Sequence, residues 1–431
     1  MTLIVMVIVF VFLLLIGMPI AFVVGLSGLA WFFQNPDFPL TIAVQRAVAP
    51  TQSFAFLAVP FFIFAGNLMN HTGITKYLII FARLLTRRMS GGMAQVSVLL
   101  SLMMGGISGS AVADAAMQAR ILGPEMTKRG YPKGYTAGLQ CLTSMIVATI
   151  PPSLGLILFG FIGGVSIGRL FLAGVIPGIM MTIVYMIVVA ITSKIRKFDP
   201  PDPDVGPPSF QEIFSSFRKS VWALLFPLIL IIGIRFGVFT PTEAGAFAVV
   251  YALITGIIIY RELNLKGFAI SLKDSFIDTG SILLIISMSG IFGFAMTFEN
   301  VPGVLGGFLF GITTNPQLLM IIIVFFLVII GLFIDANVLN LLFTPIVLPI
   351  LIPMGVDPVH FGIIMMTMVT MGVFTPPVGT GIYIVCSIMD CPVEEYMKES
   401  VPFFVALIGL TIVFIFIPDI ILWLPNLVFG P

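Results

Sequence analysis

The chain has 431 residues, of which 59% are hydrophobic and only 9% are charged, and its mean hydropathy is +1.17. A soluble fold cannot bury so large an apolar share, so the composition excludes a water-soluble protein and predicts a membrane protein. The net charge of +1 gives no basic surface for nucleic acid, and the three cysteines form neither a disulfide framework nor a zinc-ligand pattern.

Apolar stretches long enough to cross a bilayer recur from one end of the chain to the other. The first, at 2–33, has no basic n-region, which favours an uncleaved pair of spans over a signal peptide. The remaining stretches lie at 53–69, 135–163, 171–193, 221–259, 276–297, 318–350, 359–389 and 401–427. We therefore predict an all-α polytopic membrane protein with roughly 11 transmembrane helices plus two re-entrant helical hairpins.

Charged residues gather in a few segments between these stretches. The polar segment 194–220 carries Lys and Arg around a proline-rich middle, so the positive-inside rule predicts a cytoplasmic linker between two halves. Two amphipathic stretches, Ile74–Arg88 and Tyr260–Lys273, alternate apolar residues with Lys and Arg. This pattern is typical of interfacial helices, which we expect on the cytoplasmic face.

The two halves of the chain repeat at a constant spacing, equal to the separation of Pro151 from Pro376, which we call the repeat offset. Shifting the sequence by this offset superposes ATIPPSLGLI on VFTPPVGTGI. The repeat offset pairs Pro151-Pro152 with Pro376-Pro377, Gly106 with Gly331, Pro124 with Pro349, Gly130 with Gly355, and Pro177 with Pro402. Five matches at one offset indicate a duplication.

The charges predict that the two repeats are inverted. The flanks 83–92 and 125–134 hold six Lys and Arg residues, whereas the equivalent windows 308–317 and 350–359 hold none. This difference places the first flanks in the cytoplasm and the second outside. Inverted repeats with broken helices are typical of secondary transporters, whose binding site lies near the bilayer midplane.

Each half contains a cluster of small and polar residues between apolar arms. The first is GGISGSAVADAAM at 105–117, and the matching segment is GLFIDANVLN at 331–340. Arms of this length predict a re-entrant hairpin with its tip near the midplane, followed in each half by a helix broken at the proline pair.

Broken helices leave backbone groups that lipid cannot satisfy, so these groups must meet one another or a ligand. Carbonyls and hydroxyls suit a hard cation such as Na⁺, and helix N-termini suit an anion. One cation site would combine Ser108 and Ser110 with carbonyls near Thr149, and its mirror image would combine Asp335, Asn337 and Thr375. The alternative is that the small residues only allow close helix packing.

Asp114 and Asp335 are the acids best placed inside the membrane, where carboxylates are costly and usually functional. We interpret Asp335 as a cation ligand, and Asp114, one turn beyond Ser110, as a residue that instead caps or supports the hairpin. Their unlike contexts argue against an aspartyl protease. Arg120 and Arg235 could meet a substrate carboxylate, although snorkelling to the interface also explains both.

Six motifs, GISGSAVADA, EMTKRGYPKGY, TIPPS, FTPTEAGAFAVVYAL, FIDAN and FTPPVG, together resemble the large membrane subunit of TRAP (tripartite ATP-independent periplasmic) transporters, the DctM type. The resemblance extends over essentially the whole chain. NLMNHTGITKYL and GGMAQVSVLLSLMMGGISGSAVADAAMQARIL are most similar to sialic-acid members. Arg235 departs from the uncharged aromatic residue expected there in many members, which leaves a substrate-specific role open.

The resemblance implies a Na⁺-coupled importer of elevator type in the bacterial inner membrane. It also implies a small four-helix membrane subunit, here expected as a separate polypeptide, and a periplasmic substrate-binding protein. No organic cofactor and no enzymatic activity are expected. The implied sodium-binding residues are Ser108, Ser110, Thr149, Pro151, Asp335, Asn337, Thr370 and Thr375. The implied substrate-binding residues are Gly109, Pro152, Ser153, Gly155, Pro377, Gly379 and Thr380.

We therefore expect a sodium-coupled importer of an organic anion, with sialic acid (N-acetylneuraminate) favoured. The alternatives are a C4-dicarboxylate TRAP subunit and a stand-alone Na⁺/dicarboxylate symporter. An intramembrane enzyme would need a nucleophile–base or metal constellation, and a passive channel would not accumulate substrate. The expected divisions are scaffold helices with an amphipathic arm (1–90), a first transport-domain repeat (91–193), the linker (194–220), a second scaffold and arm (221–315) and a second transport-domain repeat (316–431).

Overall fold

The computed structural model describes residues 2–200 and 206–430, and every regular element in those ranges is helical. Before the linker the helices are α1 (Thr2–Leu15), α2 (Ile20–Gln34), α3 (Leu40–Val48), η1 (Ala49–Gln52), η2 (Phe54–Leu57), α4 (Ala58–Asn70), α5 (Ile74–Thr86), α6 (Gly92–Gly105), α7 (Ala111–Ile121), α8 (Gly123–Lys128), α9 (Lys133–Thr143), α10 (Met145–Thr149), α11 (Leu154–Gly163) and α12 (Ile167–Arg196). After it they are α13 (Phe210–Arg235), α14 (Pro241–Ile254), η3 (Thr255–Ile259), α15 (Leu265–Phe298), α16 (Val301–Ile312), α17 (Pro316–Gly331), α18 (Ala336–Leu351), η4 (Ile352–Met354), α19 (Pro358–Val373), α20 (Thr380–Met389), α21 (Val393–Phe416) and α22 (Asp419–Phe429). The centre of the predicted linker, 201–205, lies outside the described residues.

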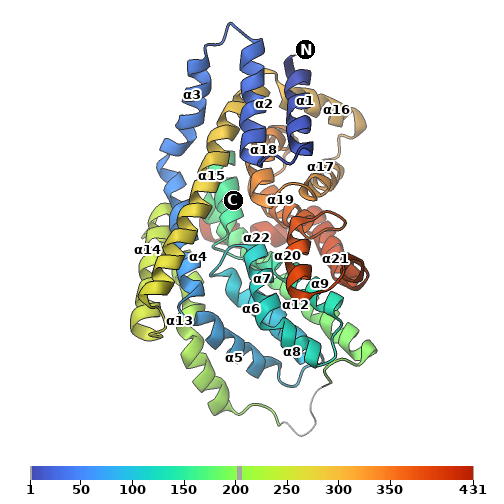
Figure 1. Ribbon diagram of the computed structural model, residues 1–431. Helices are drawn as coiled ribbons and strands as arrows, with labels where there is room; N and C mark the ends of the chain where they lie inside the picture. Colours follow the sequence, from blue (N-terminus) through green and yellow to red (C-terminus); the bar gives the residue numbers. More distant parts are fainter. Residues whose placement is uncertain (1, 201–205, 431) are drawn as a thin grey trace.

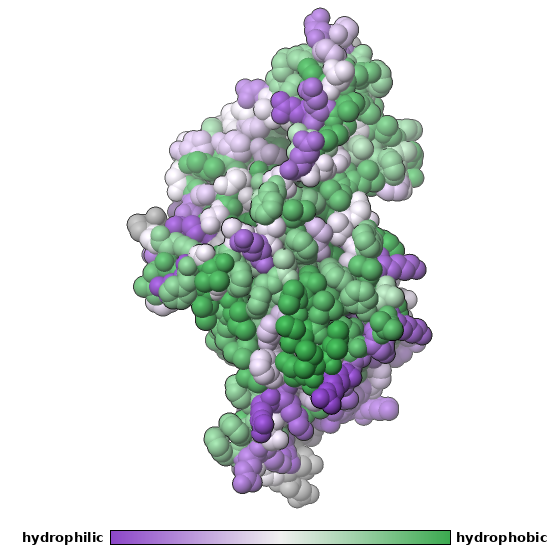
Figure 2. All heavy atoms as spheres, turned by 90° about the vertical axis from the view of Figure 1, so that its left-hand side faces the viewer, coloured by the Kyte–Doolittle hydropathy of each residue, from purple (hydrophilic) through white to green (hydrophobic). Residues whose placement is uncertain are grey.

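The surface is that of a membrane protein. Within the described ranges, six helices are long and apolar enough to cross a bilayer, and counting three bent helix pairs as single spans gives up to nine. The face in Figure 2 is widely covered by hydrophobic side chains, and polar ones lie more densely toward its two ends. The predicted eleven spans would also include shorter apolar helices such as α1 and α2, so that number stays a prediction.

Helix boundaries recur at the repeat offset. In the hairpins α7 begins at Ala111 and α18 at Ala336, and outside them α3 begins at Leu40 and α15 at Leu265. The short helices α5 and α16 also correspond, and they lie at opposite ends of the molecule (Figure 1). The duplication read from single residues thus extends to whole elements.

One predicted element is wrong. The stretch Tyr260–Lys273 was expected as a separate interfacial helix, but 260–264 is a loop and the rest opens the continuous 34-residue helix α15. A helix of that length spans about 51 Å, well beyond a hydrocarbon core of about 30 Å. The Lys-bearing turns are therefore the protruding end of a long span. The other amphipathic stretch does form a separate helix, α5.

Small residues set the closest helix contacts. A β-carbon placed on Gly28 of α2 would lie 2.9 Å from the backbone nitrogen of Phe292 in α15. Between α17 and α19, a β-carbon on Gly372 of α19 would lie 2.8 Å from the Cα of Gly331 in α17. Glycine at these positions lets the backbones touch, which drives helix association where lipid supplies no hydrophobic effect.

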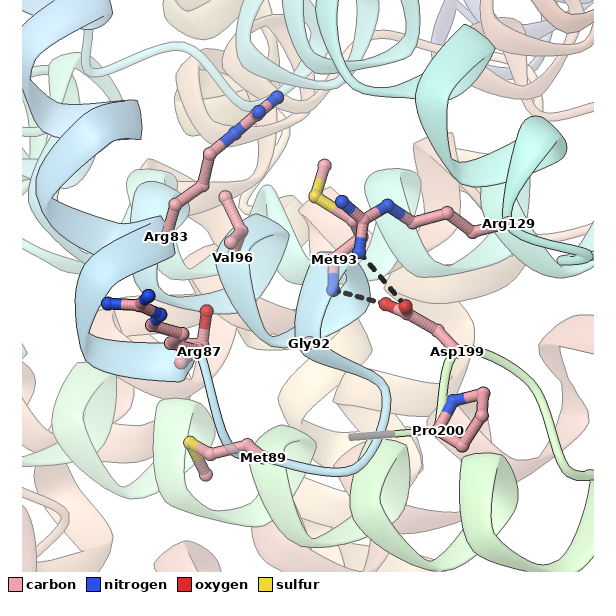
Figure 3. Close-up of a pocket in the computed structure, with 10 residues that line it drawn as sticks. Arg83, Arg87, Met89, Gly92, Met93, Val96, Arg129, Asp199 and Pro200 are labelled. Carbon is pink, nitrogen blue, oxygen red and sulfur yellow. Dashed lines mark hydrogen bonds and ion pairs between the residues drawn. The ribbon is translucent and has the colours of Figure 1, made fainter. Parts of the chain in front are cut away.

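Asp199, at the start of the linker, fixes that segment to the base of the first hairpin (Figure 3). Its carboxylate accepts a hydrogen bond from the Met93 backbone N–H at 2.9 Å and pairs with the Arg129 guanidinium at 3.0 Å. It also accepts a hydrogen bond from the Tyr131 hydroxyl at 3.2 Å. Burial raises the pKa of Tyr131, and the nearby Asp199 charge raises it further. The carboxylate thus sits at the N-terminus of α6, where the helix dipole favours negative charge.

Candidate functional site

Both predicted hairpins and both predicted breaks are present as helix boundaries. The first hairpin is formed by α6 and α7, and the first break separates α10 from α11 with a bend of 46° between the helices on either side. The second hairpin is formed by α17 and α18, and the second break separates α19 from α20. The Pro151–Pro152 and Pro376–Pro377 peptide bonds in these breaks are both cis.

The first hairpin tip lies directly against the first break. Gly109 has a φ of +61°, and a β-carbon there would lie 2.8 Å from the Pro152 carbonyl oxygen and 3.4 Å from the Leu154 backbone nitrogen. Only glycine combines this left-handed conformation with such close backbone approach. The neighbouring Ser108 hydroxyl is buried with no hydrogen-bond partner in the described part of the chain, so an oxygen ligand is available at this contact.

Serines organise the helix ends around that contact. Ser110 caps α7 by accepting from the Ala113 N–H at 3.4 Å. Ser153 donates to the Ala148 carbonyl at 2.6 Å and accepts from the Leu156 N–H at 3.4 Å, so its side chain bridges the first break. Both serines stabilise the broken backbone. The sodium role predicted for Ser110 and the substrate role predicted for Ser153 stay predictions.

The Thr149 carbonyl, however, packs against Gly174 of α12, and the Thr149 hydroxyl donates to the Met145 carbonyl at 3.1 Å. Pro151 and Pro152 are buried beside it. The sodium roles predicted for Thr149 and Pro151 stay predictions.

The second hairpin reaches across to the first broken helix. Asn340 of α18 donates to the Gly155 carbonyl at 2.6 Å, and a β-carbon on Gly155 would lie 3.6 Å from the Asn337 side-chain oxygen. Asp335 caps α18 by accepting from the Asn337 N–H at 2.9 Å, and its residue is exposed at the tip. Asn337 and Gly155, from opposite halves of the chain, therefore come together.

Sequence reasoning missed Asn340. Its signal is an amide in an otherwise apolar arm, one turn after Asn337.

The second break is more open than the first. Pro377 and Thr380 are exposed, and the Tyr383 hydroxyl donates to the Pro377 carbonyl at 2.8 Å. The Thr370 hydroxyl donates to the Met366 carbonyl and the Thr375 hydroxyl, just past the end of α19, donates to the Met371 carbonyl, each at 2.7 Å. Each hydroxyl keeps its oxygen lone pairs for another partner.

Gly379 caps α20 and is buried. It lies too close to the Val373 and Thr375 carbonyls to carry a side chain. The backbone is therefore tightly folded between α19 and α20, as it is at the first break.

A cavity of about 800 Å³ separates α3 and α15 from α11 and α18. Arg46 of α3 lines it, with its guanidinium carbon 4.8 Å from the centroid of the Phe294 ring. Ser289 of α15 also lines it, and its buried hydroxyl has no partner in the described ranges. A guanidinium and a free hydroxyl that line one cavity can together bind a carboxylate.

Sequence reasoning overlooked Arg46 in favour of two other arginines. Arg235 lies at the end of α13 with its guanidinium carbon 5.4 Å from the Phe236 ring centroid, and Arg120 is exposed in the last turn of α7. Neither lines the cavity. The available signal was a lone basic residue in the segment between Pro39 and Pro50.

Comparison with known proteins agrees with this architecture. The sequence model of the family described as tripartite ATP-independent periplasmic transporter, DctM component, matches residues 7–420. The chain is 34% identical over 419 residues to the sialic acid TRAP transporter large permease protein of Vibrio cholerae, covering 97% of each chain. It is 34% identical over 407 residues to the 2,3-diketo-L-gulonate TRAP transporter large permease protein of Escherichia coli, covering 94% of this chain and 95% of that one.

A solved structure shares the fold. The YdaH transporter of Alcanivorax borkumensis superposes with a TM-score of 0.63 over 96% of this chain and 98% of that one. The sequence identity is 13%, so the likeness concerns the fold alone.

Proposed function

The chain belongs to the DctM family of TRAP transporters as a large permease, and we propose that it imports an organic anion together with Na⁺. It is a multi-pass protein of the bacterial inner membrane, as its relatives are. The observation that carries the proposal is the contact between hairpin tip and helix break, where Gly109 meets Pro152.

Sodium is the coupling ion in this proposal because the tips offer oxygen ligands and one acid. The buried Ser108 hydroxyl lies at the first tip, and the Asp335 carboxylate lies at the second. Hydroxyls, carbonyls and a carboxylate suit a hard cation. Bound Na⁺ would fix the tips against the breaks and so complete the substrate site.

The substrate we propose is a carboxylate-bearing organic anion, with sialic acid favoured. Arg46 and the free Ser289 hydroxyl supply a carboxylate-binding pair in the cavity beside α11 and α18. The relatives are named for sialic acid and for 2,3-diketo-L-gulonate, which supports an acidic substrate of sugar type. A C4-dicarboxylate is the alternative.

Family membership also implies partners. TRAP large permeases in general work with a small membrane subunit and a periplasmic binding protein, and we propose both for this chain. We further propose an elevator movement of inverted repeats, in which the hairpins and broken helices move as a unit against α2, α4, α14 and α15. A stand-alone symporter would need neither partner.

The test is uptake into proteoliposomes that contain the permease, the small subunit and the periplasmic protein. We expect accumulation of radiolabelled sialic acid with an inward Na⁺ gradient and none when K⁺ replaces Na⁺. Undiminished uptake in K⁺ would contradict sodium coupling. Full uptake without the periplasmic protein would favour the stand-alone symporter. Uptake of a radiolabelled C4-dicarboxylate that sialic acid does not inhibit would identify the alternative substrate.

A further inference from the structure

A second group of polar side chains lies inside the first hairpin, away from its tip. It joins α6, α7 and α9, and each member is at most 1% exposed. We name it the hairpin cluster; its members are Ser97, Ser101, Asp114, Gln118, Gln140 and Thr143. Asp114 lies one turn into α7 from Ser110 of the tip.

The cluster is held together by hydrogen bonds centred on Gln118. One oxygen of Asp114, Oδ2, accepts from the Ser101 hydroxyl at 3.1 Å and from the Gln118 amide at 2.7 Å. Ser97 donates to Gln118 Oε1 at 2.5 Å, and Gln140 Nε2 donates to the Gln118 backbone carbonyl at 3.3 Å. The carboxylate is therefore rigidly placed between the two arms.

Three oxygen atoms of the cluster are left over. Asp114 Oδ1, Gln140 Oε1 and Thr143 Oγ1 are buried and lack a hydrogen-bond partner within the described part of the chain. Thr143 lies one turn beyond Gln140 on α9, and α9 packs against α7, so the three atoms belong to two helices in contact with each other. Buried oxygens without donors are costly and call for a ligand.

The charge of Asp114 also lacks a partner. None of the ion pairs in the described ranges includes Asp114. An uncompensated carboxylate in a protein interior costs on the order of several kcal/mol, and such groups are paired, protonated or bound to metal.

The second repeat shows that a hairpin of this kind needs no such cluster. At the repeat offset the six members correspond to Ile322, Phe326, Leu339, Phe343, Met365 and Met368, which are all apolar. Where the first hairpin has Ser101 beside Gln118, the second packs the Phe326 and Phe343 rings with centroids 6.0 Å apart. Apolar packing holds that hairpin, so the polar cluster serves another purpose than holding the arms together.

We propose that the hairpin cluster binds a Na⁺ ion, separate from the two tip sites, with Asp114 Oδ1, Gln140 Oε1 and Thr143 Oγ1 as ligands. A monovalent cation neutralises the carboxylate and satisfies all three oxygens at once. A proton on Asp114 would satisfy that oxygen and a single acceptor. A buried water would satisfy oxygens but leave the charge. An all-oxygen set with one carboxylate suits Na⁺.

The experiment measures Na⁺ binding by thermal unfolding of the purified full chain in detergent, with NaCl exchanged for choline chloride at constant ionic strength. Binding to the folded state raises the unfolding temperature as ligand concentration rises. To silence both tip sites, the titration is run in a background that carries Ser108→Ala and Asp335→Asn together. There we expect a remaining Na⁺-dependent rise, and we expect Asp114→Asn to remove it by weakening Na⁺ at least about tenfold, which is ~1.4 kcal/mol.

A milder pair of variants protects the test against misfolding. Thr143→Val removes one ligand at nearly constant volume and should weaken Na⁺ binding at least about threefold, which is less than the charge removal costs. Thr367→Val is the matched control, because Thr367 is equally buried and its hydroxyl, among the residues that the structure describes, bonds only to the Ile363 carbonyl of its own helix, at 2.9 Å. This variant should leave binding unchanged. A Na⁺ response that survives both Asp114→Asn and Thr143→Val would overturn the proposal. So would stabilisation of the background protein, with Ser108→Ala and Asp335→Asn, that follows pH with no dependence on Na⁺, since Asp114 would then bind a proton. Because this assay needs no transport, failed uptake by the wild type would contradict the proposed function and leave this site standing.

Discussion

At the scale of single residues, Asp335 combines two roles, as the cap of a helix and as the proposed ligand of a cation. Its side chain caps α18, and the residue is exposed at the second tip. Asparagine caps helices as well as aspartate but carries no charge. We therefore expect Asp335→Asn to keep the unfolding temperature in Na⁺-free buffer and to lower Na⁺-driven uptake at least about tenfold. Asp335→Ala should abolish uptake and also lose about 1 kcal/mol of cap energy. Wild-type uptake rates in both variants would remove Asp335 from the site.

Arg46 is the residue that decides whether the cavity recognises a carboxylate. Arg46→Gln removes the charge, so we expect the KM for the anion to rise at least about tenfold with a smaller change in kcat. Arg46→Lys should raise KM less than Arg46→Gln does, because lysine keeps the positive charge but cannot donate the two parallel hydrogen bonds of a guanidinium. The matched control is Arg235→Gln, since Arg235 also lies over a phenylalanine ring but outside the cavity. Equal KM values in both glutamine variants would contradict the assignment.

At the scale of elements, Gly109 tests whether the tip must touch the break. Gly109→Ala places a methyl group 2.8 Å from the Pro152 carbonyl, and it also forces alanine into a left-handed conformation. Gly164→Ala incurs the same conformational cost of about 1–2 kcal/mol, at a φ of +64° with nothing within 4 Å of the new methyl group. We expect Gly164→Ala to transport and Gly109→Ala to fail, with the difference measured as uptake per folded protein. Equal uptake would mean that the tip and break need not approach.

The elements that were predictable from sequence are those fixed by local chemistry. Proline pairs and glycine-rich tips break helices wherever they occur, so both hairpins and both breaks could be placed from Pro151, Pro376 and their neighbours. Arg46 and Asn340 could not be, because a cavity and an inter-repeat hydrogen bond exist only once distant helices pack. The Tyr260–Lys273 stretch failed for a related reason. An amphipathic pattern is the same for a helix lying on the membrane and for the protruding end of a long span.

At the scale of the whole molecule, duplication explains why the site has two halves that differ in detail. Each half supplies a tip and a break, and the second hairpin crosses to the first broken helix through Asn340 and Gly155. The first break is buried while the second exposes Pro377 and Thr380. The two repeats share a backbone arrangement but differ in side chains, so one repeat can bind mainly the ion and the other mainly the substrate. A single movement of both repeats would then couple ion transport to substrate transport.

Inversion of the repeats is the global feature that a direct experiment can settle. Met89 and Thr314 are equivalent positions at the repeat offset, each just before a hairpin. They flank α6 and α17, and the preceding helices α5 and α16 lie at opposite ends of the molecule (Figure 1).

We therefore expect the two positions to face opposite sides of the membrane. In a chain whose three native cysteines are replaced by alanine, Thr314→Cys should react with a membrane-impermeant maleimide added to spheroplasts. Met89→Cys should react only after the membrane is permeabilised, because basic residues hold its flank in the cytoplasm. Native uptake by each variant controls for correct insertion. Labelling of both cysteines from one side would mean that the repeats are parallel, and the opposed tips of the proposed transport cycle would then have no basis.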